Sequence, residues 1–178
     1  MRLFLALWPT EAMRGQMLMA TSELRAALAD ARGVPPQDWH LTLAFLGSVA
    51  DAAVESVASA ARGVALRTRV GVPLEVCLDH AEFWRRAQLV CAAARRAAPG
   101  AATLAATLRD TLVASGFAPD LKPFRAHVTL ARKVRRAPPV LALSAVTWRF
   151  DEFSLVESRT TPSGSLYSVL DSWQLDSG

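Results

Sequence analysis

The sequence is poor in the residues that build disulfide frameworks and cysteine-rich metal sites. It contains two cysteines among 178 residues, Cys77 and Cys91. Two thiols are too few for a structural zinc site, and a disulfide framework normally needs more. Both cysteines lie in apolar runs, so we expect two buried, reduced thiols.

Long hydrophobic runs are also missing. No stretch approaches the roughly 20 apolar residues that a membrane-spanning helix needs. The N-terminal run over residues 3–8 is too short for the core of a signal peptide, and no small-residue cleavage site follows it. These features predict a cytoplasmic protein.

Charge is sparse and uneven. Charged residues make up 20% and hydrophobic residues 52% of the chain, the balance of a globular protein. The net charge is +4, and the basic residues are all arginine except Lys122 and Lys133. A basic surface favours an anionic partner, and the planar guanidinium group suits phosphate oxygens. The length suits one domain over residues 1–178.

Hydrophobic periodicity and turn residues predict an α+β fold, mainly antiparallel, with helices on the outer faces. Strands are expected at 2–8, 39–46, 72–78, 88–93, 126–131, 148–157 and 166–174. Helices are expected at 11–31, 51–66 and 101–115, with Thr10 and Gly116 as caps. Turns are expected near 79–80 and at 160–164.

Two of the three histidines open nearly the same pentapeptide, one in each half of the chain. The two stretches are His40-Leu41-Thr42-Leu43-Ala44 and His127-Val128-Thr129-Leu130-Ala131. In a strand, residues i and i+2 point to the same face. Each motif should therefore present an imidazole and a hydroxyl on one face, with its apolar residues (Leu41, Leu43 and Phe45 in the first motif) on the other. Two such strands would line one groove.

Two imidazoles and two hydroxyls in one groove suit displacement at phosphorus, in which the attacking and leaving oxygens lie on opposite sides. One histidine can remove a proton from the nucleophile while the other protonates the leaving group. The threonine hydroxyls can donate hydrogen bonds to the nonbridging oxygens as charge builds there. The chemistry requires no metal.

The paired motifs resemble those of the 2H phosphoesterase superfamily. The similarity extends to the bacterial and archaeal RNA 2′,3′-cyclic phosphodiesterases, the LigT-like proteins also called 2′-5′ RNA ligases. It is carried by Arg2-Leu3-Phe4-Leu5-Ala6-Leu7, Trp39 to Gly47, His127 to Arg132, Glu157-Ser158-Arg159, Gly164, Tyr167 and Trp173-Gln174-Leu175.

The resemblance implies two pseudo-symmetric lobes of antiparallel sheet around a central groove. It implies hydrolysis of the terminal 2′,3′-cyclic phosphate of an RNA to a 2′-phosphate, with His40 as general acid and His127 as general base. No metal or cofactor is implied, and the reverse reaction would join RNA ends by a 2′-5′ bond. The expected partner is an RNA with a cyclic phosphate end, such as a tRNA fragment, bound by a monomer.

Other residues are candidates for binding the substrate. The resemblance places Arg132 at the phosphate, although strand parity points it away from His127 unless the strand bulges there. Phe4, Arg125 and Tyr167 are candidate substrate contacts. A run without acids could form a basic rim for the RNA backbone or an ordinary solvated face. Its members are Lys122, Arg125, Arg132, Lys133, Arg135 and Arg136.

Three alternatives remain open at this level. Asp38, on the strand face of His40, could join both histidines as metal ligands. The protein could bind RNA ends without catalysis. The same chemistry could act on a small cyclic phosphate, such as a nucleotide or an ADP-ribose derivative.

Overall fold

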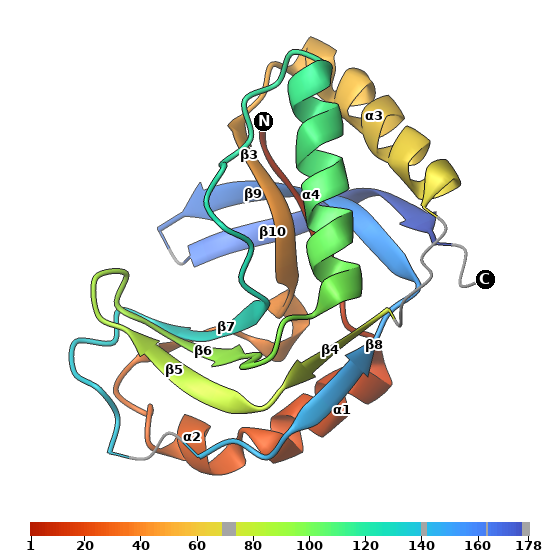
Figure 1. Cartoon of the computed structure of the whole chain (residues 1–178). Helices are drawn as coiled ribbons and strands as arrows, with labels where there is room; N and C mark the ends of the chain where they lie inside the picture. Colours follow the sequence, from red (N-terminus) through yellow and green to blue (C-terminus); the bar gives the residue numbers. More distant parts are fainter. Residues whose placement is uncertain (69–73, 140–141, 163, 176–178) are drawn as a thin grey trace.

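The computed structural model describes residues 1–68, 74–139, 142–162 and 164–175. Within these residues the chain forms two four-stranded sheets and one two-stranded sheet, all antiparallel, with helices packed against them (Figure 1). The predicted α+β class with antiparallel sheets and outer helices is confirmed.

The first sheet has the strand order β10-β9-β1-β3 and carries the first histidine motif. Its strands are β1 (Arg2–Leu7), β3 (Leu41–Ser48), β9 (Glu152–Thr161) and β10 (Gly164–Gln174). Helices α3 (Val54–Arg67) and α4 (Pro99–Ala114) pack against each other beside this sheet (Figure 1). Strand β1 is buried on both faces, because Leu3, Leu5 and Leu7 enter the main core while Phe4 and Ala6 enter a second, smaller cluster.

The second sheet has the order β2-β7-β6-β5 and carries the second motif. Its strands are β2 (Arg32–Gly33), β5 (His80–Trp84), β6 (Leu89–Ala93) and β7 (His127–Arg132). Strands β4 (Glu75–Leu78) and β8 (Val146–Arg149) form the two-stranded sheet, and α1 (Glu11–Ala20) packs against β8.

The first predicted helix is too long. Thr10 caps α1 as expected, its hydroxyl accepting a hydrogen bond from the Met13 amide (3.2 Å). The helix ends at Ala20, where the Thr21 hydroxyl donates to the Met17 carbonyl (2.7 Å), and a short helix α2 (Ser22–Ala26) follows. The Met17 carbonyl thus accepts from both the amide (3.0 Å) and the hydroxyl of Thr21, a pattern that bends helices.

The second and third predicted helices are confirmed with shifted ends. A 3-10 turn, η2 (Asp51–Ala53), precedes α3, and α4 begins at Pro99. Gly116 follows α4 with φ +85°, the left-handed conformation typical of a helix end.

Two turn predictions and one strand prediction need correction. The expected turn at Asp79-His80 is wrong, because His80 opens β5, a strand that the sequence analysis missed. The expected strand 148–157 is two strands, since β8 and β9 belong to different sheets. Residues 160 and 161, expected in a turn, belong to β9, and Ser163 lies outside the described residues. The first part of the expected strand 72–78 also lies outside them.

Residue faces also depart from simple alternation. Cys91 is buried as predicted, but Cys77 is exposed. In β3 the pairing with β1 shifts twice, so that Phe4 pairs with Phe45 and Ala6 with Thr42. Each shift inserts an extra residue in β3, a bulge that reverses the alternation. Phe45 therefore packs with Phe4, and its predicted position on the face of Leu41 and Leu43 is wrong.

In the part of the chain that the structure covers, no helix combines the length and apolarity needed to cross a membrane.

Burial along the two long helices leads to a stability prediction. Leu108 on α4 is fully buried, whereas Leu66 on α3 is 80% exposed. We expect Leu108→Ala to lower the free energy of unfolding by about 2–5 kcal/mol and Leu66→Ala by less than about 0.5 kcal/mol. Urea denaturation measures both; equal losses would contradict the packing of α4 against β3.

Candidate active site

The two motif histidines are held in the same way on two different sheets. His40 directly precedes β3 and His127 is the first residue of β7. Nδ1 of His40 lies 2.7 Å from the Asp38 carbonyl, and Nδ1 of His127 lies 2.7 Å from the Arg125 carbonyl. A carbonyl only accepts, so Nδ1 carries the proton in both rings. Each neutral imidazole therefore keeps Nε2 as its free, basic nitrogen.

The two motifs meet in one groove. Strands β3 and β7 are in contact, and Thr42 and His127 line the same cavity of about 400 Å³. The charge of protonated His127 also contributes to the lowered pKa of His40, which places the two rings within electrostatic reach. The predicted pairing of the motifs across a groove is thus present in the structure.

Both imidazoles have lowered pKa values in the free protein. Burial lowers the pKa of His40 to about 4, and the positive charges of Arg132 and His127 act in the same direction. Burial also lowers the pKa of His127, together with Arg125 and Arg132, while the Glu82 carboxylate opposes this effect. Both rings are therefore neutral at pH 7 before an anion binds.

The two threonines are half-buried beside the histidines. Thr42 makes no side-chain hydrogen bond among the described residues. The Cys91 thiol points at the Thr129 hydroxyl (3.9 Å), and burial raises the pKa of this thiol to about 11. A protonated thiol can donate to the Thr129 oxygen, which leaves the hydroxyl proton of Thr129 available to a ligand.

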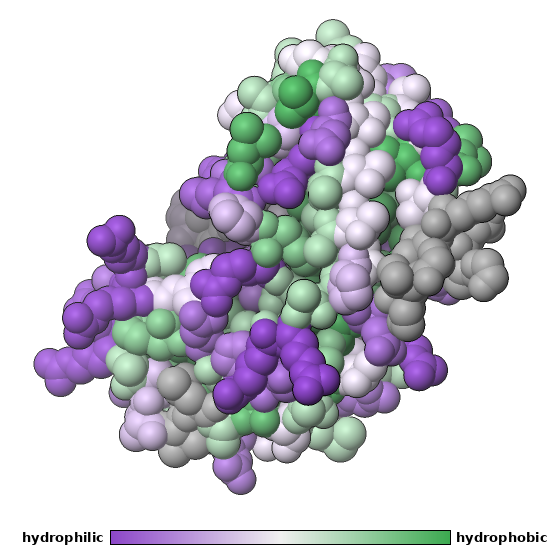
Figure 2. Space-filling view, in the orientation of Figure 1, coloured by the Kyte–Doolittle hydropathy of each residue, from purple (hydrophilic) through white to green (hydrophobic). Residues whose placement is uncertain are grey.

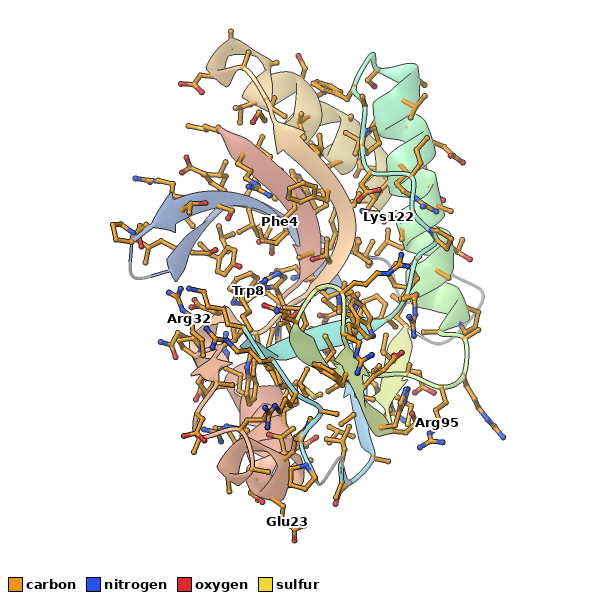
Figure 3. All side chains as sticks on the ribbon, turned by 90° about the vertical axis from the view of Figure 1, so that its left-hand side faces the viewer. Phe4, Trp8, Glu23, Arg32, Arg95 and Lys122 are labelled. Atoms are coloured by element: carbon orange, nitrogen blue, oxygen red, sulfur yellow. The ribbon has the colours of Figure 1, made fainter. Side chains whose placement is uncertain are left out.

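An aromatic cluster surrounds His40. The Trp8 ring stacks on the imidazole at 5.2 Å and 3°, Phe4 lies 4.9 Å away and Tyr167 approaches edge-on at 5.0 Å. Figure 3 shows Phe4 on the upper sheet and Trp8 below it, nearer the lower lobe. Phe4 and Tyr167 were candidate contacts; Trp8 was missed, although the strand expected at 2–8 already placed Phe4, Ala6 and Trp8 on one face. In the structure Trp8 directly follows β1 and packs against the cluster of Phe4 and Ala6.

A different arrangement supports His127. The Trp84 ring lies 4.5 Å from the imidazole, and the Arg125 guanidinium lies over the same indole at 5.1 Å. Arg125 also forms an ion pair with Glu82 (2.7 Å). Trp84 and Glu82 belong to β5, the strand that the sequence analysis missed. Arg125 therefore lies beside His127, with its guanidinium already partnered.

Arg132 faces the groove because of a bulge. Along β7 the pairing with β6 passes from Thr129 directly to Ala131, so Leu130 is an extra residue. The bulge cancels the alternation that pointed Arg132 away from His127. The positive charge of Arg132 lowers the pKa of both histidines.

The basic run from Lys122 to Arg136 does not form one surface. Lys122 and Arg125 line the cavity beside His127 and pair with Asp120 (2.9 Å) and Glu82 (2.7 Å). The remaining members of the run, Arg132, Lys133, Arg135 and Arg136, line other cavities.

The hypothesis of a metal site at Asp38 fails on geometry. Asp38 ends a 3-10 turn, η1 (Pro36–Asp38), and does not share a strand face with His40. It meets His40 through its main-chain carbonyl. The described residues contain no group of three or more His, Cys, Asp or Glu side chains placed to hold a metal ion.

Comparison with known proteins gives consistent matches. Residues 7–76 and 93–167 match the family described as LigT like Phosphoesterase. An RNA 2′,3′-cyclic phosphodiesterase of Escherichia coli is 35% identical over 81% of this chain and 80% of its own length. One of Thermus thermophilus is 29% identical over 98% and 90%. The crystal structure of E. coli LigT complexed with 3′-AMP superposes with a TM-score of 0.81 at 28% identity, covering 98% of this chain and 97% of that one.

The two histidine motifs facing one groove, the antiparallel sheets and these matches agree: the chain belongs to the LigT-like phosphoesterase family.

Proposed function

We propose that this protein hydrolyses the terminal 2′,3′-cyclic phosphate of RNA to a 2′-phosphate, with His40 as general acid and His127 as general base. The observation that carries the proposal is the matched pair of imidazoles, each bound through Nδ1 to a carbonyl and each with Nε2 free. The relatives named as RNA 2′,3′-cyclic phosphodiesterases supply the substrate class.

The reaction is a single in-line displacement at phosphorus. Nε2 of His127 accepts a proton from water as the water oxygen attacks, and the bond from phosphorus to the 3′ oxygen breaks. Nε2 of protonated His40 donates its proton to that oxygen. Proton exchange with solvent then restores protonated His40 and neutral His127. With the 5′-hydroxyl of a second RNA end in place of water, the same transfers yield a 2′-5′ linkage.

The phosphate itself would be held by Thr42, Thr129 and Arg132. Hydroxyl donors aimed at the nonbridging oxygens stabilise charge that develops in the transition state. Arg132 adds a cation that both histidines already feel. An anion bound here favours protonated His40, which raises the low pKa of that ring in the complex.

We further propose that the two lobes act as one domain, that the enzyme is a cytoplasmic monomer, and that catalysis uses no metal or cofactor.

The first test uses a short RNA that ends in a 2′,3′-cyclic phosphate, with excess EDTA. We expect wild type to release a 2′-phosphate end, and His40→Ala and His127→Ala to lose about 10²-fold or more of kcat, the contribution of an acid or base. His80→Ala, which removes the third histidine, is the comparison variant; its ring lies 3.9 Å from Glu82 and lines no part of the groove, so its loss should stay well below 10²-fold. Turnover that requires a divalent ion would refute the metal-free mechanism. A 3′-phosphate product would show that the 2′ oxygen, and not the 3′ oxygen, is the leaving group.

The threonines give a second test. Thr42→Val and Thr129→Val keep the side-chain shape but remove the hydroxyl, so we expect kcat to fall by about 10²-fold, as for loss of one oxyanion donor. Thr42→Ser and Thr129→Ser keep the hydroxyl and should recover most of the activity. Valine variants as active as the serine variants would show that the hydroxyls do not contact the phosphate.

The lowered pKa values predict the pH profile. Productive free enzyme has His40 protonated and His127 neutral, and both pKa values lie below 6.5. We therefore expect kcat/KM to fall about tenfold per pH unit above the pKa of His127, with no maximum at or above pH 7. Arg132→Gln removes a cation that lowers both pKa values, so its weaker activity should peak at higher pH.

NMR titration of the imidazole signals measures the same two pKa values without turnover. A kcat/KM that rises through pH 7 while both signals titrate below pH 6.5 would contradict the assigned roles.

A further inference from the structure

Two arginines lie directly opposite each other on neighbouring strands. Arg32 of β2 pairs with Arg132 of β7 in antiparallel register. Residues opposite each other in such a pair have Cβ atoms about 4.5–5.5 Å apart on one face of the sheet, and like charges there are destabilising. None of the ion pairs among the described residues involves either arginine. The pair is therefore a site of unneutralised positive charge.

The arginine pair opens onto the active site. Arg32 and Arg132 line a cavity of about 560 Å³ together with Asp38, whose carbonyl binds His40, and Tyr167, whose ring touches His40. The cavity's other wall is the β9–β10 hairpin. The Arg32 guanidinium lies so close to Gly164 that a Cβ there would collide with it. Figure 3 shows Arg32 where the hairpin and the lower lobe face each other.

Positive charge continues beyond Arg32. A second cavity, of about 780 Å³, is lined by Arg32, Lys133, Arg135 and Arg136, with Asp30 as its one acid. Neither Arg135 nor Arg136 takes part in an ion pair within the described residues. Figure 2 shows hydrophilic side chains gathered on this edge of the lower lobe, over the segment that follows β7.

The opposite end of the groove differs. Lys122 and Arg125, which line the cavity there, are paired with Asp120 and Glu82, whereas Arg109 in the same cavity takes part in no ion pair within the described residues. Figure 3 places Lys122 on the far side of the groove from Arg32. In each of the two ion pairs a carboxylate lies beside the cation and offsets part of the positive charge that a phosphate would meet. The two directly opposed arginines, neither of them in an ion pair within the described residues, thus favour an exit for a polyanion past Arg132 and Arg32.

We infer that Arg32, opposite Arg132, binds the phosphodiester on the 5′ side of the terminal nucleotide, and that the RNA strand continues along Arg135 and Arg136. This inference rests on the proposed function. The RNA strand is covalently joined to the phosphate held between the histidines, so the strand must leave through one of the two ends of the groove. An acidic peptide has no such link to the groove.

The test compares a substrate that reaches past the groove with one that does not. The probes are a 2′,3′-cyclic mononucleotide and a ten-nucleotide RNA with a 2′,3′-cyclic phosphate end. We expect Arg32→Gln to lower kcat/KM for the RNA about tenfold, the loss of one charged hydrogen bond, and to change the mononucleotide value less than twofold. Arg67→Gln, an exposed arginine at the end of α3, is the matched control and should alter neither.

The salt dependence of RNA affinity separates the electrostatic contribution of an arginine from the contribution of its shape. For the RNA, the slope of log affinity against log salt should become shallower by about 0.7 in Arg32→Gln and by a further similar step for each of Arg135→Gln and Arg136→Gln. Fluorescence anisotropy with an uncleavable RNA ending in a 3′-phosphate measures this without turnover. Equal losses on both substrates, or unchanged RNA affinity and slope in Arg32→Gln, would overturn the inference.

The proposed function can fail separately. If wild type cleaves neither substrate, the anisotropy data still decide whether RNA follows the arginine track. If an acidic peptide of matched charge competes with the RNA equally well, and Arg32→Gln weakens both alike, the surface is a general anion site and the inference is wrong.

Discussion

The two motif histidines and threonines stand on or beside strands whose other faces are packed into the core. Backbone pairing therefore decides which side chains reach the substrate, and the one-residue bulges in β3 and β7 matter as much as the motifs themselves. A bulge costs a ladder hydrogen bond and re-aims the residues that follow it. Here the bulges turn Phe45 towards Phe4 and return Arg132 to the face of His127, without moving the histidine and threonine of either motif.

The two halves of the site are alike in their polar chemistry and unlike in their surroundings. Both imidazoles are oriented by a carbonyl two residues earlier in the chain. His40 sits among Phe4, Trp8 and Tyr167 and has the strongly lowered pKa, whereas His127 lies beside Trp84 and feels the Glu82 carboxylate. Unequal environments are how a protein separates the roles of two similar groups. The charge around the groove is also uneven: Lys122 and Arg125 are paired with carboxylates, whereas Arg32 and Arg132 take part in no ion pair within the described residues.

The sequence by itself was sufficient for the features that depend on local pattern. Alternation and turn residues predicted the α+β class and most strands, and the repeat of His40-x-Thr42 at His127-x-Thr129 predicted a shared groove, since residues two apart in a strand face the same way. Ends of elements were less well predicted. The break at Thr21, and the separation of β8 from β9, follow from hydrogen bonds and sheet partners that the local pattern does not contain.

What only the tertiary structure decided is which distant residues meet. The run from Lys122 to Arg136 holds no acid, yet Asp120 and Glu82 neutralise its first two cations, and Arg32, far away in sequence, lies opposite Arg132. Trp8, directly after β1, and Trp84 of β5 contact the two histidines from other parts of the chain. The reason is physical: strand alternation is a local property of the backbone, whereas register, bulges and charge pairing arise only when strands from different parts of the chain are laid side by side.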